Sequence, residues 1–280
     1  MSDALTIAPP RRRTQHPLLG PGIALGLCGL VMVCGTLIPD SWLALDASMR
    51  GTSPSVPHPF GTDLMGRDIA ARTVAALANS IWTGLIASVL SASIALALAL
   101  AASVNRTADS LVGMATELAL GLPHFVLLII VAYAAGGGMA GVTVAIAVTH
   151  WPRLSRILRI EAQTVATAEY VRVSRALGRS RFWVARHHLV PHILPQYLVG
   201  IVLIFPHAIL HEAGLSFVGL GVEPHLPSIG VMLAESLRAI MAGLWWVALF
   251  PGLGLVMVAM TVELCGERFR RTNARGETGC

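Results

Sequence analysis

The sequence predicts an all-α, polytopic membrane protein with six transmembrane helices. Of its 280 residues, 55% are hydrophobic and only 12% are charged, whereas a soluble domain carries about 25% charged residues. Apolar runs long enough to cross a bilayer recur along the chain. Arginines gather in alternate connections between these runs, as the positive-inside rule requires of a multi-pass protein.

Six apolar runs account for the predicted spans, because a bilayer core needs about 20 residues in helical form. They cover residues 18–38, 81–104, two spans within 110–149, 189–211 and 240–262. The long run is divided at Gly136, where three consecutive glycines allow a tight turn. Pro123 and Pro206 are expected to bend the third and fifth spans. The first run lacks a small-residue cleavage site, so we expect it to be retained rather than removed as a signal peptide.

The arginines set the expected orientation. With a cytoplasmic N-terminus, sixteen of the 20 arginines lie on the cytoplasmic side and only Arg50, Arg67, Arg72 and Arg238 lie outside. Both termini then face the cytoplasm. The expected organisation is a cytoplasmic tail at 1–17, a first transmembrane helix at 18–38, an external segment at 39–80, a five-helix core at 81–265 with a cytoplasmic loop at 153–190, and a cytoplasmic tail at 266–280.

The composition also excludes several functions. All 20 basic residues are arginine, so the chain has no Walker A lysine for nucleotide phosphates and no lysine for a Schiff base. We therefore expect that the chain does not bind ATP on its own. The basic pI of 9.6 does not indicate nucleic-acid binding, because the arginines flank apolar spans. The four cysteines form no C-x-x-C pair.

The segment at 169–195 has the pattern of a docking surface. Residues 169–177 favour a helix, which Gly178 can end in a left-handed conformation. A second basic helix is expected from 179 to 189, before Pro191 marks the return to the membrane. The alternative is an amphipathic helix lying on anionic lipid. Docking is favoured, because lipid binding requires no glycine at a fixed position.

This segment resembles the coupling loop of ABC importer permeases, in which E-A-A is followed by three residues, G, nine residues, I, one residue and L-P. It is similar to the peptide and nickel branch, which reads close to E-Y-V-R-A-A-R-A-L-G. The resemblance implies that the residues coupling the chain to ATPases are Glu169, Tyr170, Arg172, Arg175, Ala176, Leu177, Gly178 and Pro191. Val173 and Ser174 replace two alanines of that pattern.

Two more segments resemble the same branch. Residues 58–68, followed by Arg72, are similar to its external signature H-P-F-G-T-D-x-x-G-R-D-x-x-x-R. The matching residues are Gly61, Thr62, Asp63, Gly66, Arg67 and Asp68. Asp63 is expected to cap a helix that begins near Arg67 and enters the second span. Residues 213–221, A-G-L-S-F-V-G-L-G, are the third match.

The resemblance implies the fold and the partners of a type I ABC importer permease in a bacterial inner membrane. The chain would pair with a second, related permease subunit within the lipid bilayer. Two cytoplasmic ATPase subunits would hold ATP and magnesium, so this chain would bind no cofactor and would not be an enzyme itself. An external binding protein would deliver the cargo. No nucleic acid is expected among the partners.

Ionisable residues inside the spans are candidates for the transport pathway, since they are costly in a bilayer and usually face a pore or a partner helix. The candidates are Glu117, His124, His150, His207, His211 and Glu212. His207 and His211 lie four residues apart on one helix, a spacing that can hold a divalent metal transiently. The structural alternative is that these histidines hydrogen-bond to neighbouring helices.

The cargo is expected to be nickel or a metal–chelator complex. The histidines at 207 and 211, and the pair His150 and Trp151, resemble the second permease subunit of nickel-type importers. Import of di- or oligopeptides by the same machinery is the alternative, since both branches share all three motifs. A secondary carrier with Glu117 and the histidines as proton relays is the alternative from another class, but it would not explain the segment at 169–195.

Overall fold

The computed structural model describes residues 19–221 and 226–277, so the predicted tail at 1–17 and the last three residues of the tail at 266–280 lie outside the described residues. Within the described part the regular elements are helices and no strand is present, which confirms the predicted all-α class. In chain order they are α1 (Leu19–Thr36), α2 (Asp40–Leu43), η1 (Ala47–Met49), α3 (Ile69–Ala102), α4 (Arg106–Gly121), α5 (His124–Ala134), α6 (Gly138–Thr167), α7 (Glu169–Ala176), α8 (Arg181–Val184), η2 (Ala185–Leu189), α9 (Val190–Phe217), α10 (Ile229–Met241) and α11 (Trp246–Glu277).

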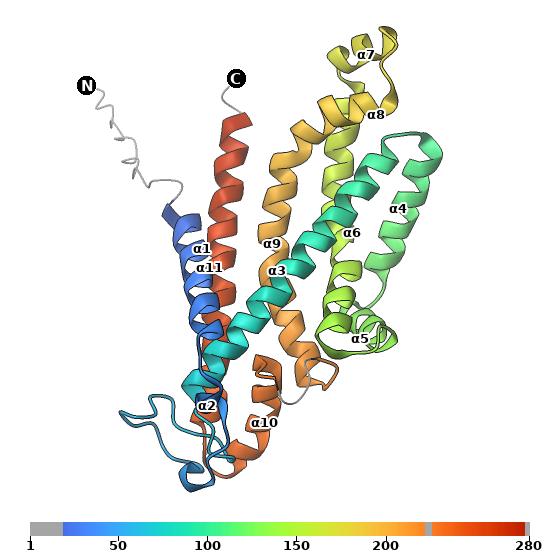
Figure 1. Cartoon of the computed structure of the whole chain (residues 1–280). Helices are drawn as coiled ribbons and strands as arrows, with labels where there is room; N and C mark the ends of the chain where they lie inside the picture. Colours follow the sequence, from blue (N-terminus) through green and yellow to red (C-terminus); the bar gives the residue numbers. More distant parts are fainter. Residues whose placement is uncertain (1–18, 222–225, 278–280) are drawn as a thin grey trace, which may run out of the picture.

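The helices form an elongated bundle with two distinct ends (Figure 1). The start of α1, the end of α11 and the short helices α7 and α8 lie at one end. The segment between α1 and α3, together with α10, lies at the other end. This arrangement agrees with the predicted separation of the arginine-rich segments from the external segments.

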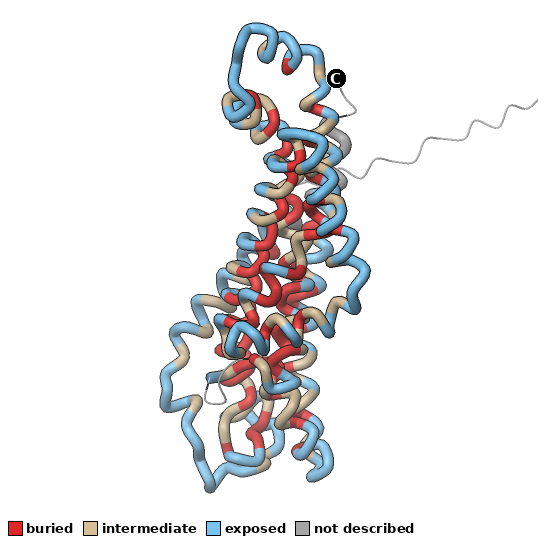
Figure 2. Tube along the Cα trace, turned by 90° about the vertical axis from the view of Figure 1, so that its right-hand side faces the viewer, coloured by how far each residue is buried: buried red, intermediate tan, exposed pale blue. Residues whose placement is uncertain are grey.

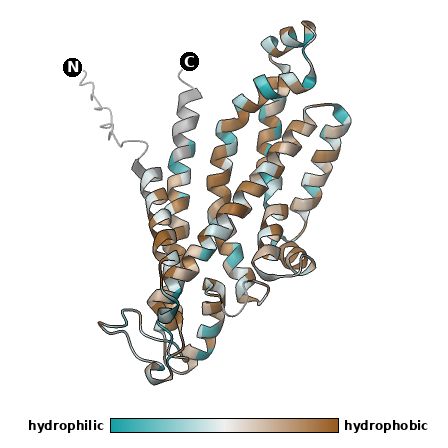
Figure 3. Cartoon of the chain, viewed as in Figure 1, coloured by the Kyte–Doolittle hydropathy of each residue, from teal (hydrophilic) through white to brown (hydrophobic). Residues whose placement is uncertain are grey.

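Three helical stretches are long and apolar enough to cross a membrane: α3, the continuous run Arg181–Phe217 and the part Trp246–Arg268 of α11. Figure 3 shows apolar residues along the lengths of these helices. The described part of α1 includes a shorter apolar helix, Ala24–Thr36. Helices α1 and α6 occupy the places of the first and fourth predicted spans.

The predicted third span is broken rather than continuous. Helices α4 and α5 meet the length and composition of one span only together, and they are bent by 101° at the break between them. The break falls at Leu122 and Pro123, where Leu122 has an extended backbone. Proline disfavours a helical conformation in the residue before it. The proline therefore interrupts the helix here, whereas we expected it only to bend the span. The predicted turn after α5 is confirmed, because Gly136, Gly137 and Gly138 all have positive φ angles.

Helix α3 is the central element and packs chiefly on α6, α9 and α1. Its buried positions are mostly small, including Ala76, Ala87, Ala92, Ala95 and Ala99. Small side chains let membrane helices approach closely, so that van der Waals contacts hold them together where the hydrophobic effect contributes little. Figure 2 shows buried residues concentrated in the interior of the bundle and exposed residues at both of its ends.

A buried carboxyl group ties α3, α9 and the start of α10 together. Glu212 on α9 is 1% exposed and accepts hydrogen bonds from three serine hydroxyls, those of Ser80 at 2.5 Å, Ser216 at 2.9 Å and Ser228 at 3.3 Å. A buried polar group is tolerated when it is hydrogen-bonded in this way. Glu212 was predicted to line the transport pathway. In the structure it is buried between helices of this chain and hydrogen-bonded to serines.

Candidate functional site

The predicted docking segment forms a separate knob at one end of the bundle. We define the docking knob as residues 169–189, which comprise α7, α8 and η2. Helix α7 ends at Ala176, and Gly178 follows with a φ angle of 82°, so the predicted left-handed helix end is confirmed. Ser180 accepts a hydrogen bond from the backbone N–H of Trp183 and caps α8. Pro191 is the second residue of α9 and directly follows η2 within the continuous helical run Arg181–Phe217.

A small apolar core attaches the docking knob to the ends of α6 and α9. Val171 is fully buried and belongs to a cluster with Val165 from α6, Val184 and Leu189 from the knob, and Ile193 from α9. At the edge of the knob, an Arg181 guanidinium N–H donates to the carbonyl oxygen of Val104 beyond α3 at 3.0 Å. The docking knob is therefore in direct contact with the ends of α6 and α9 and with the segment that follows α3.

The outer face of the docking knob combines exposed apolar and charged side chains. Tyr170, Val173, Leu177 and Phe182 are between 51% and 77% exposed. Three charged residues of α7 are exposed as well: Glu169, Arg172 and Arg175. An exposed apolar group rimmed by charges is typical of a protein-binding surface, and Leu177 and Phe182 are its most exposed members.

An aromatic and histidine cluster supports this surface from behind, and the sequence reasoning did not find it. The Trp183 ring stacks on His187 with centroids 4.4 Å apart, and the Arg179 guanidinium lies 4.6 Å from the Trp183 ring centroid. His188 Nε2 lies 2.9 Å from the Ser174 hydroxyl oxygen and thereby links η2 to α7. The contact between His188 and Ser174 joins the two halves of the knob across Gly178, whereas the contacts of Trp183 lie within the half that follows Gly178.

The external motif forms a cluster of four charges at the opposite end, two of them buried. The Asp63 carboxylate receives the Arg67 Nε–H at 2.7 Å and an Arg72 guanidinium N–H at 2.8 Å. Both arginines also donate to Glu235 on α10, at 2.8 and 2.9 Å. Asp63 and Arg72 are each only 4% exposed. The cluster fastens the external segment to α3 and α10.

The roles of the two aspartates in this motif differ from those that we predicted. Asp63 does not cap the helix. Asp68 caps α3 instead, by accepting from the backbone N–H of Ala71 at 2.8 Å. Asp68 also lies 2.7 Å from the His58 ring. Asp63 stabilises the preceding turn by accepting from the backbone N–H groups of Met65 and Arg67. Glu235 lies about 170 residues away in the sequence, so no local pattern indicated its participation.

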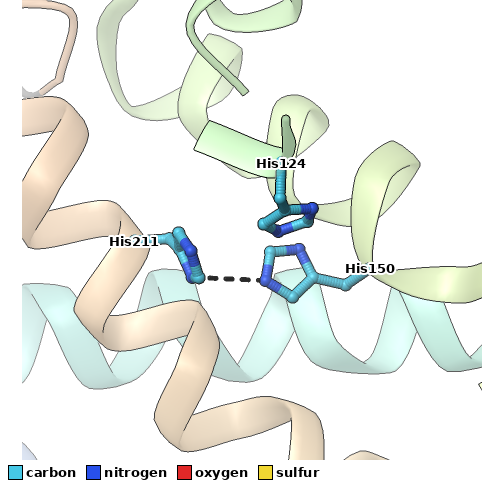
Figure 4. A group of neighbouring side chains, drawn as sticks. All are labelled: His124, His150 and His211. Atoms are coloured by element: carbon cyan, nitrogen blue, oxygen red, sulfur yellow. Dashed lines mark hydrogen bonds between the residues drawn. The ribbon is translucent and has the colours of Figure 1, made fainter. Parts of the chain in front are cut away.

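Three of the predicted pathway histidines meet between the helices (Figure 4). His124 begins α5, His150 lies in α6 and His211 lies in α9. Their ring centroids are 4.7 to 5.0 Å apart in edge-to-face arrangements. One possible ligand nitrogen from each ring lies within 4.8 Å of the others, and all three residues are partly exposed. We call this group the histidine triad.

Three other predicted pathway residues lie outside the triad. His207 is exposed, and its Nδ1–H donates to the Leu203 carbonyl of its own helix at 3.2 Å. The expected pair of His207 and His211 is therefore replaced by the histidine triad. Glu212 is engaged with serines. Glu117 forms an exposed ion pair with Arg156 at 2.6 Å.

The fold and these sites define a class of protein. Membrane-spanning helices are joined to an exposed docking knob at one end, and the described residues present no nucleotide-binding loop. These features are those of a membrane permease subunit.

Comparison with known proteins identifies the family. The chain belongs to the family described as the inner membrane component of binding-protein-dependent transport systems, which it matches over residues 93–269. It is a permease subunit of an ABC importer in the inner membrane and is not itself an enzyme. Members of this family function with a partner permease, ATPase subunits and a binding protein.

Curated relatives of this chain carry names that refer to peptides. It is 32% identical over 266 residues to a putative peptide transport system permease protein of Brucella abortus, covering 93% of this chain and 88% of the relative. It is 30% identical over 257 residues to the dipeptide transport system permease protein DppC of Bacillus subtilis, covering 91% and 80%. A putative peptide permease protein of Brucella suis is 35% identical over 228 residues, covering 81% and 76%.

Proposed function

We propose that this chain forms half of the translocation pathway of an ATP-driven importer for di- or oligopeptides. The similarity to permeases named for peptide and dipeptide transport carries this proposal. It takes the place of the expectation of nickel, which rested on the resemblance of His207, His211 and the pair His150 and Trp151 to nickel-type importers. In the structure, His211 belongs to the histidine triad and His207 lies outside it.

In this proposal the docking knob faces the cytoplasm and binds one of two ATPase subunits. The exposed side chains of Leu177 and Phe182 supply apolar contacts, and the exposed Glu169, Arg172 and Arg175 supply charged ones. The ATPases move the knob, and the knob core around Val171 transmits that movement to α6 and α9. An external binding protein delivers the cargo to the opposite end.

The charge cluster of Asp63, Arg67, Arg72 and Glu235 has a supporting role at that outer end. Glu235 also lines a cavity of about 700 Å³ between the glycine turn before α6 and the ends of α9 and α10. This cavity is open to the outside of the bundle and is large enough for a short peptide. We assign it to cargo entry, with the charge cluster holding one of its walls in place.

Uptake measurements distinguish the two cargo classes. Cells that lack the gene are expected to lose the uptake of radiolabelled dipeptide while retaining uptake of nickel, and re-expression of the chain is expected to restore dipeptide uptake. Depletion of ATP with the proton gradient held constant is expected to stop the restored uptake, which excludes a secondary carrier. Loss of nickel uptake with unchanged dipeptide uptake would refute the peptide assignment.

A further inference from the structure

The histidine triad brings together three imidazoles from three separate helices. His124, His150 and His211 come from α5, α6 and α9, so no local repeat of the sequence explains their meeting. Imidazole nitrogen is a favoured ligand of late first-row divalent ions. We propose that the histidine triad is a binding site for such an ion, of the cobalt, nickel, copper or zinc kind.

In two triad members, hydrogen bonds to backbone carbonyls hold the hydrogen on Nδ1. The Nδ1 of His150 lies 3.0 Å from the Ile146 carbonyl oxygen, and that of His211 lies 2.7 Å from the His207 carbonyl oxygen. A carbonyl oxygen only accepts, so each Nδ1 carries the hydrogen and each neutral ring presents an unprotonated Nε2. The His150 Nε2 also lies 3.4 Å from His211 Nδ1 (Figure 4) and would exchange this long contact for a bond to the ion. Histidines that bind metals usually donate their second N–H to a carbonyl or carboxylate in this way.

The third member is not committed elsewhere. Within the described residues, the His124 side chain makes ring contacts with His150 and His211 and no hydrogen bond. Either of its nitrogens is available to a metal. His124 also directly follows the proline break between α4 and α5, and this break positions it against α6 and α9.

The spacing of the triad suits an ion after a small closure. Bonds of about 2.0–2.1 Å in a tetrahedral arrangement place ligand nitrogens about 3.3–3.4 Å apart. One nitrogen from each ring lies within 4.8 Å of the others. Rotations of the three side chains, with loss of the contact between His150 Nε2 and His211 Nδ1, would bring three nitrogens to that spacing. Three ligands leave a fourth position open, as in zinc sites that exchange their fourth ligand.

The charge around the triad favours reversible binding. The Glu212 carboxylate is occupied by serine hydroxyls, so a bound ion would be held by neutral imidazoles alone. Arg153 lies three residues after His150 on α6 and adds a positive charge nearby. The ion would therefore remain exchangeable, and it would join α5, α6 and α9 while it is bound.

Cobalt binding tests this proposal directly, because Co²⁺ in a histidine site gives visible ligand-field bands. The full chain, co-purified with its partner subunits in lipid nanodiscs and freed of its affinity tag, is titrated with Co²⁺ in the absence of peptide. We expect saturable binding of one ion per chain and displacement by Ni²⁺ or Zn²⁺. His150→Ala or His211→Ala is expected to weaken binding by at least about tenfold, since even outer-shell changes cost that much at metal sites.

Two further variants keep the test decisive. His207→Ala is the matched control, because it removes an imidazole from the same helix as His211 but from outside the triad, and it should leave binding unchanged. His124→Cys retains a ligand and should add a thiolate-to-cobalt band in the near ultraviolet. No saturable binding, an equal loss in His207→Ala, or no new band in His124→Cys would overturn the proposal. Because no peptide is present, these outcomes are separate from the test of the peptide cargo.

Discussion

Replacing Gly178 by valine is expected to abolish ATP-driven uptake while the chain remains folded in the membrane. Gly178 has a φ angle of 82°, and a Cβ at this position would meet open space. The substitution is therefore penalised by backbone conformation alone, and for a β-branched residue that conformation is an outlier. The strain is on the order of 1–3 kcal/mol. Relief of that strain would shift α7 relative to α8 and so disrupt the docking surface that includes Leu177.

Two matched variants separate a docking defect from general destabilisation. Gly178→Asn should retain uptake, since asparagine tolerates the left-handed conformation far better than valine. Gly243 has a φ angle of 84° and equally open surroundings, but it lies between α10 and α11 at the other end of the molecule. Gly243→Val should therefore retain most uptake at equal abundance in the membrane. Normal uptake by Gly178→Val, or an equal loss in both valine variants, would contradict this account of the knob.

Replacing Arg72 by leucine is expected to cause a large loss of stability. Arg72 is 4% exposed and joins the buried Asp63 to Glu235. Its removal leaves Asp63 buried with Arg67 as its remaining ion-pair partner. Breaking a buried ion pair costs about 3–5 kcal/mol when the charge left behind has no partner, so this figure is the upper bound for the variant. The midpoint of thermal unfolding in detergent should fall clearly.

The ion pair of Arg156 and Glu117 provides the control for this variant. Its side chains are 48% and 72% exposed, and exposed pairs contribute only about 0–1 kcal/mol. Arg156→Leu should therefore leave the unfolding midpoint nearly unchanged. Similar midpoints for the Arg72 and Arg156 variants would show that the external cluster does not fasten the outer end of the bundle.

Features that depend on nearby residues were predictable from the sequence. The glycines at 136–138 and at 178 have the positive φ angles that a turn and a helix end require. In each case the residues that predict the feature lie within a few positions of it in the sequence. The all-α fold class was predictable for the same reason, since each apolar run is a contiguous stretch of the sequence. Pro123 signalled a bend, but the 101° angle between α4 and α5 depends on how both helices pack.

Contacts between distant segments could not be predicted in this way. The spacing of His207 and His211 indicated a shared helix face, but a spacing does not show what packs against that face. In the structure His211 meets His124 and His150 from two other helices. The role of Glu235 was missed because its arginine partners lie about 160 to 170 residues away.

Photo-crosslinking from the docking knob tests the central claim that this end of the permease binds the ATPases. A photoreactive amino acid is placed at Leu177, which is 77% exposed, and in a separate chain at Met241, which is 91% exposed at the end of α10. The account predicts an adduct with the ATPase subunit from position 177 and none from position 241. An ATPase adduct from Met241, or none from Leu177 in the assembled transporter, would contradict it.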